Sequence, residues 1–186
     1  MQIAQLNPHV GVEITGLSGS QAFDARVADE CRRLLDLHGV VVFREAAIDD
    51  DTLIEFSARL GTLAVVPTGE HVRPEIQTIT MRPGATNPVL AAYRRGNFLW
   101  HIDGATDERP QKGTFLSAHE IDDSGQGGTE FATTYAAYDS LSADDKRSID
   151  DLQVVHSFAA AQQRANPDAD DAFRATWNRV PDRVHP

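Results

Sequence analysis

The first forty residues carry apolar positions that change from a strand spacing to a helical spacing and back. The segment from Val10 to Leu17 alternates loosely between apolar and polar side chains, which predicts a strand. The next apolar residues recur at helical spacing: Phe23, Val27, Cys31 and Leu34. Ser20 is the predicted N-cap of this helix, and Gly39 follows its end. The apolar, β-branched run over 40–43 then predicts a buried strand.

A second helix is expected between the aspartates at 49–51, which suit a helix N-terminus, and Gly61, which suits its end. Its apolar face comprises Leu53, Phe56 and Leu60. Strand signals dominate afterwards, in short runs between Gly, Pro and Asp turns. These runs are Ile76–Met81, Phe98–Asp103, Gly113–Ile121 and Gly128–Thr133. A further helix over about 142–152 begins with a capping-box pattern, Ser142-x-x-Asp145.

The last segment, from Ala159 to Pro186, is polar and is interrupted by Pro167 and Pro181. We therefore expect an insert or lid over about 155–186 instead of a closing core element. Helices at the front, strands in the middle and an irregular tail predict an α+β, mainly β fold whose sheet lacks its final strands. The expectation is one domain over 1–186 that stops before its C-terminal strands.

Composition and charge narrow the class of protein. Hydrophobic residues make up 41% of the 186 positions and charged residues 24%, which is typical of a globular domain. The net charge of −11 opposes binding to nucleic acid or to an anionic membrane surface. No apolar run is long enough to span a bilayer. The single cysteine, Cys31, excludes an internal disulfide, and a reducing, cytoplasmic location is the expectation.

The sharpest local motif is Trp100-His101-Ile102-Asp103. On a strand, residues two apart point to the same side, so His101 and Asp103 would project together. An imidazole beside a carboxylate provides two of the three ligands in a two-histidine, one-carboxylate iron site. The motif alone carries little weight: with 7 His and 19 Asp, chance gives about 0.7 such triplets. A hydrogen-bonded structural pair is the competing interpretation.

A second motif, Gly127-Gly128-Thr129-Glu130-Phe131, begins another predicted strand after a turn. The Thr129 hydroxyl could donate a hydrogen bond to a carboxylate beside a metal. An ordinary glycine turn followed by a β-favouring threonine explains the same residues.

Taken in order along the chain, six segments resemble the taurine dioxygenase and dichlorophenoxyacetate dioxygenase family. They are Gly11–Gly16, His38–Arg44, Phe56–Gly61, Trp100–Asp103, the Gly127–Phe131 run and Ala136–Leu141, with Val184–Pro186 after them. Each segment is weak, but their order and spacing agree from about Val10 to the last residue.

The resemblance implies a double-stranded β-helix, a cupin-like jelly roll with flanking helices, incomplete at the C-terminus. It implies that His101 and Asp103 bind Fe(II), and that Thr129 binds the distal carboxylate of the co-substrate 2-oxoglutarate. Asn97 falls where relatives line the co-substrate and substrate pocket, with a turn residue as the alternative. The resemblance also implies that a third ligand, a histidine, and an arginine for 2-oxoglutarate follow Pro186.

Three other histidines are candidates for the third ligand: His119, His156 and His185. His119 is expected to be a half-buried strand residue. The other two fall where relatives tend to carry a histidine that is not a ligand. None of the three is therefore predicted to bind the metal.

The function implied by the resemblance is hydroxylation of a small organic, anionic substrate with O2, releasing succinate and CO2. Residues 1–186 alone are expected to turn over little. Taurine itself is doubtful as the substrate, because Val66-Pro67 stands where the taurine enzyme has a histidine–proline pair. A non-catalytic cupin-like fragment or pseudoenzyme and a metal-dependent hydrolase remain as alternatives. Self-association into a homo-oligomer also stays open.

Overall fold

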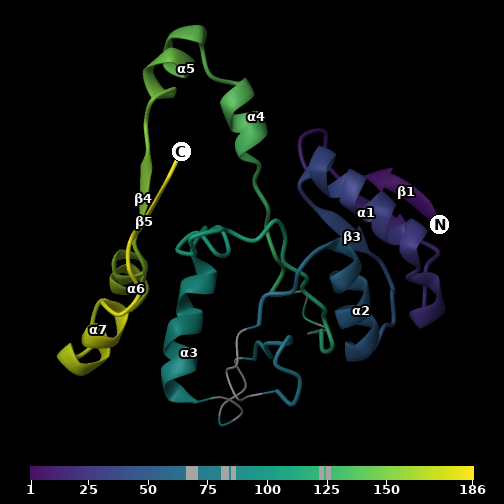
Figure 1. The fold of residues 1–186 in the computed structure, drawn as a ribbon, viewed down its shortest axis with the longest axis horizontal. Coiled ribbons are helices and arrows are strands. Elements are labelled where there is room, and N and C mark those ends of the chain that lie inside the picture. Colours follow the sequence, from purple (N-terminus) through teal and green to yellow (C-terminus); the bar gives the residue numbers. More distant parts are fainter. Residues whose placement is uncertain (66–70, 81–83, 85–86, 122–123, 125–126) are drawn as a thin grey trace. The chain divides into compact units, whose positions relative to one another are not determined.

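The computed structural model describes residues 1–65, 71–80, 84, 87–121, 124 and 127–186. Figure 1 labels the helices and strands of the chain. They divide into two compact units. The first unit comprises Met1–Val66 and Phe115–Arg147, and the second unit comprises Pro67–Thr114 and Ser148–Pro186.

The first unit contains a three-stranded sheet in the order β1 (Gln2–Gln5), β2 (Val12–Thr15) and β3 (Val41–Phe43). Strand β1 pairs antiparallel with β2, and β2 pairs parallel with β3. Helix α1 (Ala25–His38) connects the parallel strands, as a parallel pair requires a crossover. A short 3-10 turn, η1 (Ser20–Ala22), precedes it. The two strands and the helix predicted here are confirmed, although β3 is half-buried and not buried as predicted.

The ends of α1 show which capping signals the chain uses. The Asp24 carboxylate accepts hydrogen bonds from the backbone N–H groups of Arg26 and Val27 at 2.9 and 3.0 Å. Asp24 is therefore the N-cap, and the prediction of Ser20 was wrong, because Ser20 begins the separate 3-10 turn. Gly39 ends the helix with φ 71°, a left-handed conformation that favours glycine.

Helix α2 (Asp50–Leu60) completes the core of the first unit. Asp49 is its N-cap, accepting from the Thr52 backbone N–H at 2.8 Å, and Gly61 ends it, as predicted. The ring of Phe56 meets those of Phe23 and Phe43 edge to face, with centroids 5.1 and 5.7 Å apart. These rings pack with the apolar face of α1 against the sheet.

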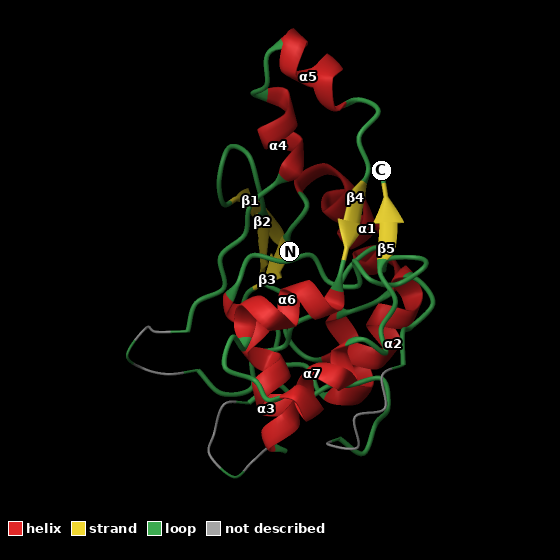
Figure 2. Ribbon diagram, turned by 90° about the vertical axis from the view of Figure 1, so that its left-hand side faces the viewer, coloured by secondary structure: helices red, strands yellow, loops and turns green. Residues whose placement is uncertain are grey.

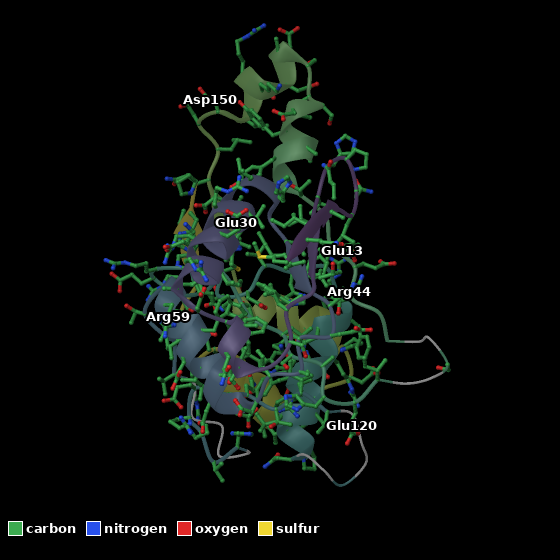
Figure 3. The ribbon with its side chains drawn as sticks, turned by 90° about the vertical axis from the view of Figure 1, so that its right-hand side faces the viewer. Glu13, Glu30, Arg44, Arg59, Glu120 and Asp150 are labelled. Carbon is green, nitrogen blue, oxygen red and sulfur yellow. The ribbon has the colours of Figure 1, made fainter. Side chains whose placement is uncertain are left out.

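An ion pair on the surface of the first unit joins two of its strands. Arg44, directly after β3, places Nε 3.1 Å from Oε2 of Glu13 on β2 (Figure 3). Both side chains are partly exposed, so the pair contributes little to stability.

Two short helices lie later in the chain, α4 (Thr134–Asp139) and α5 (Ala143–Ile149). The capping pattern predicted for the second is confirmed. The Asp145 backbone N–H donates to Ser142 Oγ at 3.1 Å, and the Ser142 hydroxyl lies 2.7 Å from Asp145 Oδ2.

The second unit is built from helices and a two-stranded sheet (Figure 2). Its elements are α3 (Pro88–Arg94), η2 (Arg95–Phe98), β4 (Val154–His156), α6 (Phe158–Ala165), α7 (Asp171–Trp177) and β5 (Arg183–His185). Strands β4 and β5 pair antiparallel. Tyr93 of α3 stacks against Phe158 and Phe173, and Phe173 meets Trp177 edge to face. The tail predicted as irregular from Ala159 onward therefore contains two helices and a strand.

The strands predicted in the middle of the chain do not form. None of the described residues in 76–80, 98–103, 113–121 and 128–133 belongs to a ladder; Met81 lies outside the described residues. Strand backbone needs a neighbouring strand to take its hydrogen bonds, and no described segment pairs with these. The β-favouring composition is therefore present without the pairing that a strand requires. Among the described residues, no helix is long and apolar enough to cross a membrane.

Candidate metal centre

The segment that carries the predicted metal ligands is an extended loop between two turns of the second unit. The η2 turn ends at Phe98, and Leu99 then adopts φ −98° and ψ 148°, an extended conformation. A turn begins at Asp103. Leu99 is thus extended, as expected for a strand residue, but the segment is unpaired among the described residues.

The ring of His101 is oriented by the backbone two residues earlier. Its Nδ1 lies 2.7 Å from the carbonyl oxygen of Leu99. A carbonyl oxygen can only accept, so Nδ1 carries the proton in this hydrogen bond. In the neutral imidazole, Nε2 then has a free lone pair, which is the state a metal ligand requires.

The free nitrogen faces the carboxylate of Asp103. His101 Nε2 and Asp103 Oδ1 are 3.4 Å apart, and the side chains are 47% and 48% exposed. Two ligands about 2.1 Å from one ion at a right angle are about 3 Å apart. The observed spacing is close to that value, so these two residues fit adjacent positions on one metal ion.

A tight turn holds Asp103 from its C-terminal side. Gly104 has φ 68°, and the Asp107 N–H donates to its carbonyl at 2.9 Å. A Cβ added to Gly104 would collide with the side-chain amide of Gln111. Gln111 is exposed and could move aside, so it is the positive φ that favours glycine here. The pair lies directly before this turn, in a segment that is unpaired among the described residues and not in the strand expected from the sequence.

The other predicted site residues lie in different settings. Asn97 is an exposed residue of η2, four positions before His101. Thr129 is exposed and belongs to the first unit. Val66-Pro67, the residues that bear on taurine, lie outside the described residues.

The structure also describes the three histidines that are not predicted to bind the metal. His119 is not in a strand: its side chain is exposed, with Nε2 3.8 Å from Asp50 Oδ1. The expectation of a half-buried strand residue was wrong, because its segment has no pairing partner. His156 on β4 and His185 on β5 have ring centroids 5.5 Å apart.

Sequence reasoning missed the polar residues that support η2 from α6. Asn166 and Gln162 are buried, at 4% and 6% exposure, and Asn166 hydrogen-bonds to Arg95 of η2. The available signals were Ser157, an N-cap for α6, and Asp170, an N-cap for α7. Both capping residues are visible in the tail that we predicted to be irregular.

Within the described part of the chain, no group of three or more His, Cys, Asp or Glu side chains could hold a metal ion. The arrangement is therefore a histidine–carboxylate pair that supplies two donors. The protein is therefore a candidate metalloprotein with a mixed α and β fold. Sites that include such a pair leave coordination positions on the metal open.

Comparison with known proteins gives the family. The model of the family described as "Taurine catabolism dioxygenase TauD, TfdA family" matches residues 2–186. The chain belongs to this family, and the resemblance found in the sequence is confirmed.

Two curated relatives illustrate the range of the family. An α-ketoglutarate-dependent sulfonate dioxygenase from Saccharomyces cerevisiae is 30% identical over 194 residues, covering 100% of this chain and 47% of the relative. An (S)-phenoxypropionate/α-ketoglutarate-dioxygenase from Sphingobium herbicidovorans is 29% identical, covering 87% of this chain and 55% of the relative. The chain thus spans about half the length of these relatives.

The fold is shared with solved structures. The crystal structure of AAD-2 in complex with Mn(II) and N-oxalylglycine matches with a TM-score of 0.68 and 25% identity, covering 100% of this chain and 63% of that chain. A structure from Burkholderia xenovorans matches with the same TM-score at 22% identity. The chain therefore has the mixed α and β fold of the corresponding part of these proteins.

Proposed function

We propose that the protein is an Fe(II)- and 2-oxoglutarate-dependent dioxygenase that hydroxylates a small, anionic organic substrate. One observation carries the proposal. His101 Nε2 lies 3.4 Å from Asp103 Oδ1 while Nδ1 is held by the Leu99 carbonyl, so two donors are prepared for one metal ion. Family membership supports the choice of iron and 2-oxoglutarate.

The anionic substrate class is supported by the relatives. Their names specify sulfonates and phenoxypropionate, which carry a sulfonate or a carboxylate group. Mn(II) and N-oxalylglycine, an analogue of 2-oxoglutarate, bind to a protein of the same fold. Taurine remains a doubtful substrate on the sequence evidence of Val66-Pro67.

Each proposed site residue has a separate task. His101 donates its Nε2 lone pair and Asp103 its carboxylate, whose negative charge offsets part of the charge of the ion. Thr129 donates its hydroxyl hydrogen bond to the distal carboxylate of 2-oxoglutarate, and Asn97 lines the pocket. When bound, Fe(II) with 2-oxoglutarate supplies the oxidising chemistry for O2-dependent hydroxylation, with succinate and CO2 as products.

The fold proposal is a cupin-like jelly roll with flanking helices, to which residues 1–186 contribute as one dioxygenase domain. The segment over about 155–186 is an insert in that domain. The TM-score of 0.68 to dioxygenase structures supports this architecture. We also propose a cytoplasmic location, supported by the single cysteine, which suits a reducing compartment.

The test replaces the two ligands in the full protein. Asp103→Ala and His101→Ala should each weaken Mn(II) binding by more than about 100-fold, since loss of a residue that only hydrogen-bonds to a ligand already costs about 10–100-fold. Both should also abolish 2-oxoglutarate-dependent O2 uptake and succinate release. His119→Ala, an exposed histidine of the first unit, is the matched control and should retain both properties. Full iron occupancy with turnover in Asp103→Ala would refute the assignment.

A non-catalytic, cupin-like protein is the second candidate, because the described residues supply only two metal donors. The same measurements separate the two. A protein that binds Mn(II) through His101 but consumes no O2 with 2-oxoglutarate and any of a set of sulfonates and phenoxyalkanoates would be non-catalytic.

A further inference from the structure

A buried amide in the second unit joins α6 to the turn that precedes the metal pair. Asn166, directly after α6, donates through Nδ2 to the Ala92 carbonyl and to Gln162 Oε1, both at 3.1 Å. Its Oδ1 accepts from Arg95 Nη1 at 3.2 Å. The side-chain amide of Asn166 therefore has partners for both its donor and its acceptor groups.

Burial raises the free-energy cost of losing any of these hydrogen bonds. Asn166 and Gln162 are both buried, at 4% and 6% exposure, and Arg94 of α3 is 5% exposed. A buried polar group that loses its partner costs more than the hydrogen bond contributes when it is made. The amide consequently favours one arrangement of α3 and η2 over others.

The partners of Asn166 lie at the junction of α3 and η2. The Ala92 carbonyl also accepts the backbone N–H of Arg95, so one oxygen fixes both the end of α3 and the start of η2. Gly96 follows, where an added Cβ would lie 3.6 Å from Gln162 Nε2. The α6 side chains thus reach the backbone of the turn itself.

Hydrogen bonds continue from the turn to the metal pair. The Leu99 N–H donates to the Gly96 carbonyl at 2.9 Å, and the Leu99 carbonyl accepts from His101 Nδ1 at 2.7 Å. The orientation of the imidazole depends on Leu99, and Leu99 depends on the turn.

Helix α6 is itself fixed by its neighbours. The rings of Tyr93 and Phe158 have centroids 5.7 Å apart, and the Tyr93 hydroxyl lies 2.6 Å from Thr176 Oγ1 on α7. Figure 2 shows α3, α6 and α7 grouped in this unit. A lid would have to break such contacts each time it opened, whereas an anchor keeps them.

We propose that Asn166 is a positioning residue for the metal centre: by fixing the junction of α3 and η2, it sets Leu99 and so holds His101 Nε2 toward Asp103. The insert that carries Asn166 anchors the site, and does not cover it as a lid. This inference rests on the proposed function, because it assumes that His101 and Asp103 bind the metal.

Two variants of the full protein test the proposal against a matched control. Asn166→Ala removes all three hydrogen bonds, and Arg95→Met removes only the one from the exposed side of the turn, which protects folding. Tyr93→Phe is the control, since it removes the hydroxyl contact to Thr176 in the same helix cluster without touching η2. Thermal unfolding of each variant gives the loss of stability with which the metal data are compared.

We expect Asn166→Ala to weaken Mn(II) binding, measured by electron paramagnetic resonance of the free ion, by about tenfold, the lower range for a residue behind a ligand. Arg95→Met should weaken it by a smaller factor in the same direction. Both should shift the visible absorption band of the Fe(II)–2-oxoglutarate complex, which reports ligand geometry. Tyr93→Phe should leave the Mn(II) affinity and the absorption band unchanged, even if its unfolding temperature falls as far as that of Asn166→Ala.

The outcomes separate this proposal from the one on which it rests. Normal Mn(II) affinity and an unshifted band in both folded variants would refute the positioning role and leave the proposed function intact. Equal loss of affinity in Tyr93→Phe would also refute it, because the effect would then follow stability alone. If the wild-type protein binds no Mn(II), or binds it equally well without His101, the proposed function fails and the positioning role fails with it.

Discussion

The two units bury different kinds of side chain. Of the nine buried hydrophobic residues among those described, eight lie in the first unit and one, Trp177, in the second. Of the four buried polar or charged residues, one lies in the first unit and three lie in the second: Arg94, Gln162 and Asn166. The buried core of the first unit is therefore mainly hydrophobic, whereas the second unit combines an aromatic cluster with buried hydrogen bonds around η2.

This difference indicates that the first unit supports the structure and the second orients the candidate metal ligands. Hydrophobic burial stabilises without regard to direction, so it suits a supporting core. Hydrogen bonds fix orientation, which a metal site requires of its ligands. The loop with the metal pair also exposes Phe98 and Trp100, at 78% and 71%, so it gains little from apolar burial in the described structure.

The largest effect should come from truncating the centre of the first core. Phe56 is 1% exposed and packs against Phe23, Phe43 and Phe115. Phe56→Ala should lower the free energy of unfolding by about 3–5 kcal/mol. Trp100→Ala, an equally drastic change at an exposed site, should change it by less than about 0.5 kcal/mol. Urea unfolding followed by circular dichroism measures both, and similar losses would contradict the contrast between the units.

An intermediate effect should appear in the reactivity of Cys31. Burial raises the pKa of its thiol to about 11, and the residue is 3% exposed. At pH 8 roughly one thiol in a thousand is then ionised, and only the thiolate reacts. Labelling with a maleimide should be more than about 100-fold slower than for the protein unfolded in guanidinium. The Phe56→Ala variant should react faster, and fast labelling of the native protein would show that the first core is open.

The smallest effect concerns acid stability of the first unit. Hydrogen bonds from the Val27 N–H and then from the Arg26 side chain lower the pKa of Asp24, and those from Thr52 lower the pKa of Asp49. Since folding lowers these pKa values, their stabilisation is complete above the ordinary value of 3.8 and is lost as pH falls through the folded values.

Asparagine provides the matched variant, because it caps a helix equally well without titrating. The double variant Asp24→Asn, Asp49→Asn should show a flatter decline in unfolding temperature than the wild type below about pH 4. Each single variant should lie between the two. Identical curves for all four proteins would show that these carboxylates do not link pH to stability.

Local signals explain why the elements from β2 to α2 in the first unit were predictable. Gly39 and Asp49 mark helix ends through groups within four residues, so their roles could be read from the sequence. Even the error at Ser20 was local, because Asp24 four residues later carries the stronger acceptor. The middle strands failed because pairing is not local, and their composition alone could not specify a partner.

The candidate site was predictable only in part. The closeness of His101 and Asp103 was expected and is observed, although the two residues lie in a loop before the Gly104 turn and not in a paired strand. Its role in binding metal stays a prediction. Asn166 could not be identified from the sequence, because its partners Ala92 and Arg95 lie 74 and 71 positions away.

That separation has a consequence during synthesis on the ribosome. The sheet of the first unit needs only residues 2–43, whereas Asn166 emerges 74 residues after Ala92. At about 5–20 residues per second, this leaves roughly 4–15 s in which the α3–η2 junction has no anchor. During that interval only hydrogen bonds within residues 96–101 orient the ring of His101, so we expect the metal pair to be set only after Asn166 has emerged.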